Sequence, residues 1–197
     1  MNLDWDAKKY STDFSYVHEY GADLLGLIDG RGGRVLDLGC GNGALTIACA
    51  LRNPRAKILG IDDWSGLFSS GKRDCEKNAE KAKVTNVSFE KGELTTLDFE
   101  DETFDAVFSN YGFNSLPGNK QVLMREALRV LKEGGVFAFH DMMPSAKFGN
   151  MRLFVSQLRK EGFEDARVMR TDEDLFMSPS EAKKMKLRFS TLVIGKK

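Results

Sequence analysis

The chain has 197 residues, of which 42% are apolar and 29% are charged, and its 29 basic side chains are balanced by 29 acidic ones. This length suits one α/β domain with a buried core, and the zero net charge argues against a general affinity for nucleic acid. No apolar run approaches the ~20 residues of a membrane span, and no apolar leader opens the chain, so we expect a cytoplasmic protein away from membranes. Three cysteines without C-x-x-C spacing and two distant histidines give no basis for a metal site.

Apolar periodicity predicts strands and helices in alternation. A helix is expected over 15–28, ahead of a glycine-rich break. Further helices are expected over 43–53, 70–84, 118–135 and 148–162, and strands over 34–39, 57–62, 87–92, 104–110, 136–141, 165–170 and 188–197. The sequence does not decide whether a helix lies between the third and fourth strands, and no clear helix separates the last two strands.

Short apolar strands with helices between them indicate a parallel sheet that is covered on both faces. The last two strands follow one another directly, so we expect them to pair antiparallel at one edge. No repeat and no linker is visible. The sequence therefore predicts a single domain over 1–197, with a helical cap at the N-terminus.

A glycine-rich turn, "VLDLGCGNGA" at 35–44, follows the first predicted strand. Gly39, Gly41 and Ala44 fit the G-x-G-x-x-G/A spacing of a dinucleotide site, with Asp62 about 20 residues further on. Gly39, Gly41 and Gly43 equally fit the G-x-G-x-G turn of enzymes that bind S-adenosylmethionine (SAM). Both cofactors need backbone without a Cβ beside the free N–H groups of a helix start.

Asp37, two residues before the first glycine, favours SAM over NAD. Its carboxylate would repel a pyrophosphate at the helix start, whereas it can help to hold the ammonium of a zwitterionic amino acid. Asp62 suits the ribose hydroxyls of either cofactor. Glu93 adds an acceptor where an adenine amino group could lie. Because ligands of open parallel sheets bind beyond the carboxyl ends of the strands, we expect these residues on one rim, together with Asn110, His140 and Asp141.

The chain resembles the class I SAM-dependent methyltransferases over nearly its whole length. "VLDLGCGNG" is similar to the first motif of the family, "ILGIDDWSG" to its second, and "REALRVLKEGGVFAFHD" to the segment that leads into its fifth strand. Within the class, the chain is similar to small-molecule enzymes of the ubiquinone/menaquinone-biosynthesis and trans-aconitate types. The resemblance implies a Rossmann-like, doubly wound, seven-stranded sheet of order 3-2-1-4-5-7-6, with the last strand antiparallel and a helical lid within 1–30.

The resemblance also implies a cofactor site for SAM, with S-adenosylhomocysteine (SAH) as the product. Gly39 and Gly41 would contact the methionine part of SAM through main chain, Gly43 would pack the helix start, and Asp37 would lie near the amino group. Asp62 would bind both ribose hydroxyls, and Tyr10 and Tyr16 would close over the cofactor. The remaining cofactor residues would be Cys40 within the turn, Asp63, Trp64, Glu93 and Leu94 around the adenine, and Asn110.

Methyl transfer from a sulfonium needs alignment and exclusion of water, and it needs a base only when the acceptor keeps a proton. The "NPPY" tetrad of N-methylating relatives is absent, since Tyr111 and Gly112 follow Asn110. The candidate catalytic residues are Asn110, which could orient an acceptor, and the pair His140 and Asp141, which could deprotonate one. Asn110 also has a structural interpretation as a cap of the following loop, and Asp141 as a cap or loop anchor. His18, on the predicted lid, is favoured as a packing residue.

We expect a small-molecule acceptor and a monomer or homodimer. Two alternatives stay open. The basic stretch "KKMKLR" at 183–188 could serve a methyltransferase that acts on RNA or protein. The chain could also be a non-catalytic module that binds SAM or SAH.

Overall fold

The computed structural model describes residues 32–65, 71–173, 175 and 178–197. The predicted helix over 15–28 and the lid within 1–30, with Tyr10, Tyr16 and His18, lie outside these residues. The described helices and strands follow in the order β1 (Arg34–Leu38), α3 (Ala44–Arg52), β2 (Lys57–Asp62), α4 (Lys72–Lys81), β3 (Val87–Lys91), β4 (Phe104–Asn110), α5 (Lys120–Arg129), β5 (Leu131–Met142), α6 (Ser145–Phe148), α7 (Met151–Lys160), β6 (Glu164–Arg170), α8 (Pro179–Lys184) and β7 (Ser190–Lys196).

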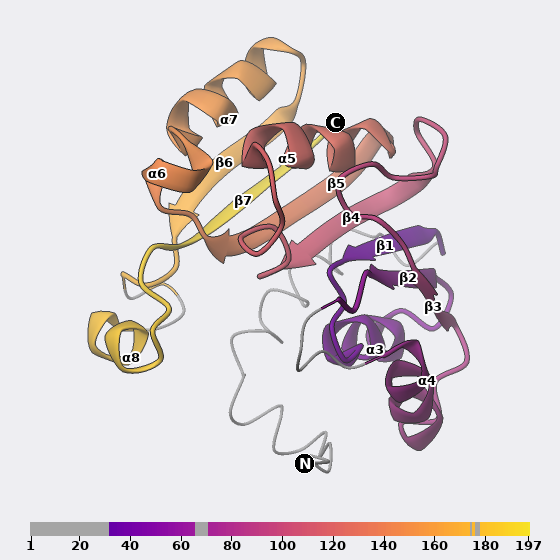
Figure 1. Ribbon diagram of the computed structural model, residues 1–197. Coiled ribbons are helices and arrows are strands. Elements are labelled where there is room, and N and C mark those ends of the chain that lie inside the picture. Colours follow the sequence, from indigo (N-terminus) through magenta and orange to yellow (C-terminus); the bar gives the residue numbers. More distant parts are fainter. Residues whose placement is uncertain (1–31, 66–70, 174, 176–177) are drawn as a thin grey trace.

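The strands form one seven-stranded sheet of order β3-β2-β1-β4-β5-β7-β6 (Figure 1). Strands β1 to β5 pair parallel with their neighbours in the sheet. β7 runs antiparallel to both β5 and β6. The predicted fold class, strand order and antiparallel last strand are confirmed.

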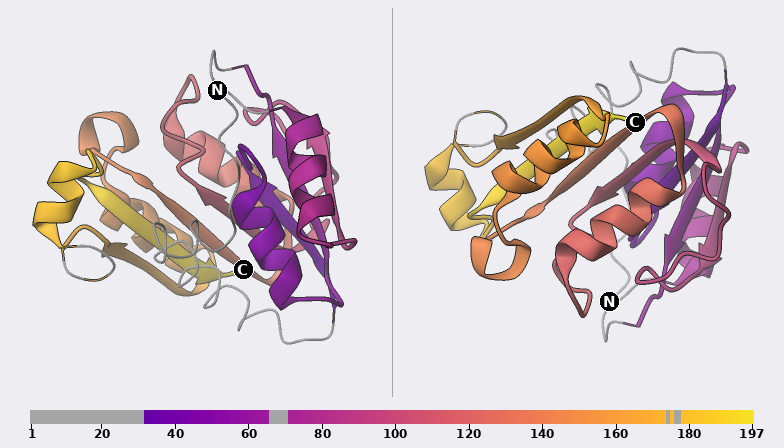
Figure 2. Two further views of the ribbon diagram at one scale, coloured as in Figure 1. Left: turned by 90° about the horizontal axis from the view of Figure 1, so that it is seen from below. Right: turned by 90° about the horizontal axis from the view of Figure 1, so that it is seen from above.

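Helices cover both faces of the sheet (Figure 2). Alternate residues of β1 point to opposite faces, as a pleated strand requires. Leu36 and Leu38 belong to the core under α5 and α7, whereas Val35 belongs to the core beside α3. Because β1 and β4 are buried on both sides, their sequences are nearly continuous apolar runs, and the polar residues that remain are confined to the strand ends and to Asp37.

The helix predicted over 118–135 is too long at its C-terminal end. Asn119 caps α5 by accepting from the N–H groups of Gln121 and Val122, and the helix ends at Arg129. β5 already begins at Leu131, which pairs with Phe104 of β4. The glycines at 134–135 therefore lie within a strand irregularity rather than at a helix end. Gly134 has a positive φ of 76°, which glycine adopts without strain.

Two further helix predictions were wrong in detail. The helix predicted over 148–162 begins too early, because Gly149 turns the chain at a φ of 71° after the short α6 and Asn150 caps α7, which runs from Met151 to Lys160. A short helix, α8, lies between the last two strands, where none was predicted. Its start carries a capping box formed by Ser178 and Glu181, a pattern that is readable in the sequence "SPSE".

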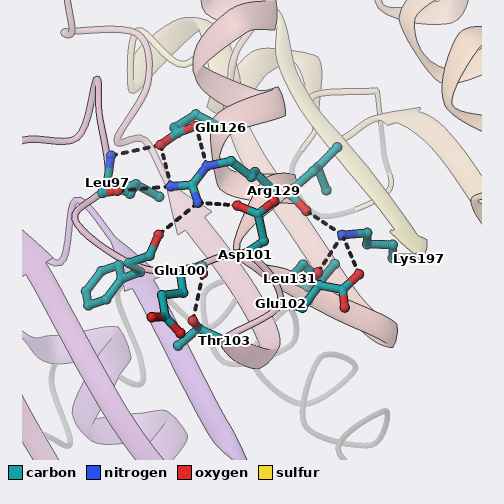
Figure 3. Close-up of polar contacts among 11 residues, drawn as sticks. Leu97, Glu100, Asp101, Glu102, Thr103, Glu126, Arg129, Leu131 and Lys197 are labelled. Atoms are coloured by element: carbon teal, nitrogen blue, oxygen red, sulfur yellow. Dashed lines mark hydrogen bonds and ion pairs between the residues drawn. The ribbon is translucent and has the colours of Figure 1, made fainter.

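The connection between β3 and β4 contains no helix, although one was left open there; all of its residues, 92–103, are described. Arg129 of α5 holds this connection in place (Figure 3). Its guanidinium donates to the carbonyl oxygens of Leu97 and Phe99 at 3.0 and 2.8 Å, and it also pairs with Glu126 and Asp101. The side chain of Arg129 thus satisfies two backbone acceptors of a connection that has no helix of its own.

Candidate cofactor and acceptor site at the carboxyl ends of the strands

The three glycines of the turn after β1 have different surroundings. All have positive φ, of 77°, 56° and 79° for Gly39, Gly41 and Gly43. A Cβ on Gly39 would lie 2.9 Å from the Cα of Gly112, and one on Gly43 would lie 2.8 Å from the ring of Phe89. A Cβ on Gly41 would meet nothing within 4 Å among the described residues. Gly39 and Gly43 therefore serve close packing, whereas Gly41 is the one of the three that has space beside it among the described residues.

Asp62, at the end of β2, binds the open part of the turn. One carboxylate oxygen accepts from the Gly41 N–H at 2.8 Å, and the other accepts from the Trp64 N–H at 2.8 Å. The Trp64 indole N–H and the Cys75 thiol both donate to the Gly41 carbonyl oxygen, at 2.7 and 3.2 Å. The backbone of Gly41 is thus fixed on both sides, next to a carboxylate with unused lone pairs.

Asp37 lies beneath the turn and is 1% exposed. Its carboxylate accepts a hydrogen bond of 2.6 Å from the Thr46 hydroxyl on α3. Burial, opposed by the Thr46 hydrogen bond and reinforced by the charge of Asp62, raises the pKa of Asp37 to about 7. A carboxyl group in this state is half ionised near neutral pH, so a cation brought close to it would favour its charged form.

Glu93 and Leu94 follow β3 and extend the rim. The Leu94 side chain is buried and lies 3.8 Å from the position that a Cβ on Gly39 would occupy. Glu93 is exposed, and its carboxylate accepts from the Thr95 hydroxyl. The structure thus brings Leu94 to the glycine turn, whereas the Glu93 side chain is bound to its own loop.

Asp63 is turned toward the loop that follows β2. Its two carboxylate oxygens accept from the N–H and the hydroxyl of Ser65, at 3.0 and 2.7 Å. These hydrogen bonds, led by the one from the Ser65 backbone, lower the pKa of Asp63. Asp63 is therefore a loop-fixing side chain in the described structure, next to Trp64 and Asp62.

Cys40 is buried within the turn and lies against Gly60 of β2: a Cβ on Gly60 would lie 3.0 Å from the Cβ of Cys40. All three cysteines of the chain, Cys40, Cys49 and Cys75, are buried and free. Cys40 thus has the surroundings of a small packing residue.

The ends of β4 and β5 bring Asn110 and His140 together. The two residues are partners in the strand register, and Asn110 Oδ1 lies 2.8 Å from His140 Nδ1. The other ring nitrogen, Nε2, lies 2.9 Å from the hydroxyl oxygen of Thr171, which follows β6. Burial lowers the pKa of His140 to about 3, so the imidazole is neutral. Tyr111 packs edge-on against this ring at 4.7 Å and adopts a positive φ of 57°.

Asp141 faces the opposite side of β5, as alternation along a strand requires. It is fully buried, and its carboxylate accepts from the N–H groups of Asn114 and Met142 at 2.9 and 2.7 Å. Burial raises the pKa of Asp141 to about 6, although these backbone hydrogen bonds oppose the rise. Asp141 anchors the loop after β4 to the end of β5.

The structure therefore collects most of the predicted residues at the carboxyl ends of the central strands, where the strand order reverses between β1 and β4. Sequence reasoning missed Thr46, Gly112 and Thr171. Thr171 could have been found by the rule that gave Asn110, since it is the first residue after a strand. Thr46 and Gly112 carry no local signal, because their contacts with Asp37 and Gly39 depend on tertiary packing.

Within the described residues, no group of three or more His, Cys, Asp or Glu side chains is arranged to hold a metal ion. None of the helices in the described part of the chain is long and apolar enough to cross a membrane.

Residues 29–186 match the family described as a methyltransferase domain. The chain belongs to the SAM-dependent methyltransferases. It is 34% identical over 129 residues to an arsenite methyltransferase of Aquipseudomonas alcaligenes, a match that covers 62% of this chain and 36% of the relative. It is 33% identical over 136 residues to a trans-aconitate 2-methyltransferase of Methylobacterium nodulans, with 68% of this chain and 48% of the relative covered. The chain thus spans less than half the length of these two relatives.

The fold of this methyltransferase is shared by solved structures at low sequence identity. A SAM-dependent methyltransferase from Aquifex aeolicus matches with a TM-score of 0.63 at 19% identity, and 98% of each chain is covered. The family resemblance predicted from the glycine turn and the later motifs is confirmed.

Proposed function

We propose that this protein transfers a methyl group from SAM to a small-molecule acceptor. The observation that carries the proposal is the turn at Gly41, where a Cβ would meet none of the described residues within 4 Å and where the Asp62 carboxylate binds the backbone N–H at the reversal of strand order. Family membership supports the cofactor, since the family uses SAM.

The residues of the rim fit the parts of SAM. A carboxylate has about four lone-pair positions, and Asp62 uses two of them on backbone N–H groups, which leaves acceptors for two ribose hydroxyls. At Gly41 the methionine part of SAM can approach the main chain closely, and Asp37 supplies a buried negative charge beneath the turn for the ammonium. Trp64, Asp63, Glu93 and Leu94 are proposed around the adenine. When bound, SAM supplies a methyl group that its sulfonium already activates.

The acceptor is proposed to lie across the rim, near Asn110, His140 and Asp141. Asn110 is half-buried, whereas His140 and Asp141 are buried and bound to neighbouring groups. We therefore assign contact with the acceptor to Asn110. Exclusion of water and alignment would supply most of the rate, and no base from the described residues is required for an acceptor that is already deprotonated.

The names of curated relatives support a small-molecule acceptor, because they refer to arsenite, trans-aconitate and demethylmenaquinone. We further propose a single domain over 1–197 that works in the cytoplasm as a monomer or homodimer, without nucleic-acid or membrane partners. Three free cysteines are typical of proteins from a reducing compartment.

Titration of SAH into the wild type and into Asp62→Asn tests the cofactor site. We expect the substitution to weaken SAH binding by roughly 100-fold, since it removes a charged acceptor of two hydroxyls and disturbs the Gly41 turn. Asp98→Asn, which changes an exposed carboxylate on the β3–β4 connection, is the matched control and should leave SAH affinity unchanged. Equal SAH affinity in the two variants, or binding of NAD in place of SAH, would show that the assignment is wrong.

A further inference from the structure

Three side chains from three strand ends form a continuous hydrogen-bonded chain across the rim. Thr171 contacts His140 at 2.9 Å, and His140 contacts Asn110 at 2.8 Å. Thr171 is 0% exposed and His140 is 2% exposed, whereas Asn110 is half-buried at the outer end. The hydrogen-bonded chain of side chains therefore runs from the interior of the sheet to the side of the site where the acceptor is proposed to lie.

The burial of Thr171 fixes the direction of this chain. Among the described residues, the hydroxyl of Thr171 has one hydrogen-bond partner, Nε2 of His140. The backbone N–H of Thr171 forms a separate hydrogen bond with the Ser190 carbonyl oxygen. A buried hydroxyl that does not donate loses a hydrogen bond to water without replacing it. Thr171 must therefore donate its proton, and Nε2 of His140 must accept.

The proton of His140 then lies on Nδ1. Burial keeps the imidazole neutral, so it carries a single proton, and a ring that accepts at Nε2 donates at Nδ1. The group that receives this N–H must be the amide oxygen of Asn110, because the amide nitrogen cannot accept. The NH₂ group of Asn110 is consequently turned away from His140.

We propose that Thr171 and His140 are positioning residues that hold Asn110 with its amide N–H donors toward the site, where they bind an oxygen atom of a carboxylate or carbonyl group. This inference rests on the proposed function for the identity of the molecule that carries the oxygen, which is either the carboxylate of SAM or the acceptor substrate. Neither Thr171 nor His140 touches the reacting atoms. Both act through Asn110.

The position of the proton is testable without turnover. In ¹⁵N-labelled protein the imidazole of His140 should show a protonated Nδ1 and an unprotonated Nε2, and His18→Gln assigns the signals, since the chain has two histidines. Thr171→Val should mix or reverse the tautomer, and Thr171→Ser should restore it. Thr191→Val is the matched control, since it removes another buried hydroxyl, which donates to the Phe189 carbonyl oxygen at 2.9 Å. A wild-type ring protonated at Nε2 would overturn the proposal, whether or not the protein binds SAH.

Asn110→Asp then identifies the oxygen, since it replaces the N–H donors by an acceptor of the same shape. If the oxygen belongs to SAM, the variant should bind SAH roughly tenfold more weakly. If it belongs to the acceptor, SAH affinity should be unchanged and methyl transfer should fall by a similar factor. Thr171→Val should lower the same measured value, whether SAH affinity or methyl transfer, by a smaller factor, and Thr171→Ser should restore it. An Asn110→Asp protein with unchanged SAH affinity and unchanged transfer would refute the proposed role of the amide.

Discussion

Asp37 and Asp62 lie on neighbouring strands and have opposite surroundings. Asp62 is half-buried and bound by two backbone N–H groups, so its charge is paired with fixed donors. Asp37 is 1% exposed and accepts from one hydroxyl, and burial raises its pKa to about 7. The two carboxyl groups therefore differ in burial and in their hydrogen-bond donors, which suits the proposed roles of Asp62 toward ribose hydroxyls and of Asp37 toward an ammonium group.

Binding of SAH should release a proton from Asp37. The ammonium group stabilises the carboxylate and lowers its pKa below the value of about 7 in the free protein, so near pH 7 the site should lose about half a proton. For the same reason SAH affinity should rise as the pH increases from 6 to about 8. Calorimetric titration in buffers of different ionisation enthalpy measures the proton count.

In that experiment Asp37→Asn serves as the comparison, because it keeps the side-chain shape without a titrating proton. Proton release that persists in Asp37→Asn would assign the effect to another group and remove the basis for placing the ammonium near Asp37.

The glycines of the turn should respond differently to alanine. Gly39→Ala combines a left-handed φ of 77° with a Cβ 2.9 Å from backbone, so we expect a loss of roughly 3 kcal/mol in the free energy of unfolding. Gly41→Ala should lower the free energy of unfolding by only about 1 kcal/mol, the cost of its φ of 56°. The substitution places a methyl group where the cofactor is proposed to lie. Urea unfolding together with SAH titration separates the two effects; a more damaging Gly41→Ala in the unfolding measurement would contradict these roles.

At the scale of elements, the connections between strands set the shape of the rim. The β3–β4 connection carries Glu93 and Leu94 and has no helix of its own, and α5 holds it through Arg129 (Figure 3). Arg125, on the same helix, pairs with Glu161 on the surface instead. The two arginines therefore differ in what they hold: backbone carbonyl groups in one case and an exposed carboxylate in the other.

Arg129→Ala should destabilise the protein by roughly 2–4 kcal/mol, because it leaves the carbonyl groups of Leu97 and Phe99 and the Glu126 carboxylate without their donor. Arg125→Ala, the matched control, should cost less than about 1 kcal/mol, as is typical of exposed ion pairs. Chemical denaturation measures both values. Similar losses in the two variants would mean that Arg129 contributes as a surface charge only.

At the scale of the whole molecule, the sequence predicts the sheet well because buried parallel strands have distinctive apolar runs. The strands predicted over 57–62 and 104–110 have the same bounds in the structure, and Asp62 and Asn110 follow as strand-end residues. The boundary between α5 and β5 was not predictable from glycine alone. Gly134 and Gly135 can end a helix or interrupt a strand, and the pairing of Leu131 with Phe104 decides between the two.

Contacts between distant residues account for most of what the sequence did not reveal about the site. The hydrogen bonds from Thr171 through His140 to Asn110 join residues from three strand ends. Which atom donates in each bond depends on burial, which only the tertiary structure provides. The proposed contacts with the acceptor lie on the same side of the rim. Sequence motifs predict the glycine turn proposed to bind the cofactor, whereas no motif singles out the residues proposed to contact the acceptor.

The most direct test of the account is the transfer of labelled methyl groups from SAM in the presence of a cell extract that is then separated by molecular size. The wild-type protein should place the label in the small-molecule fraction, and Asp62→Asn should not. Label found only in protein or RNA would contradict the proposed acceptor class. SAH binding without any transfer of label would instead indicate a non-catalytic binding module.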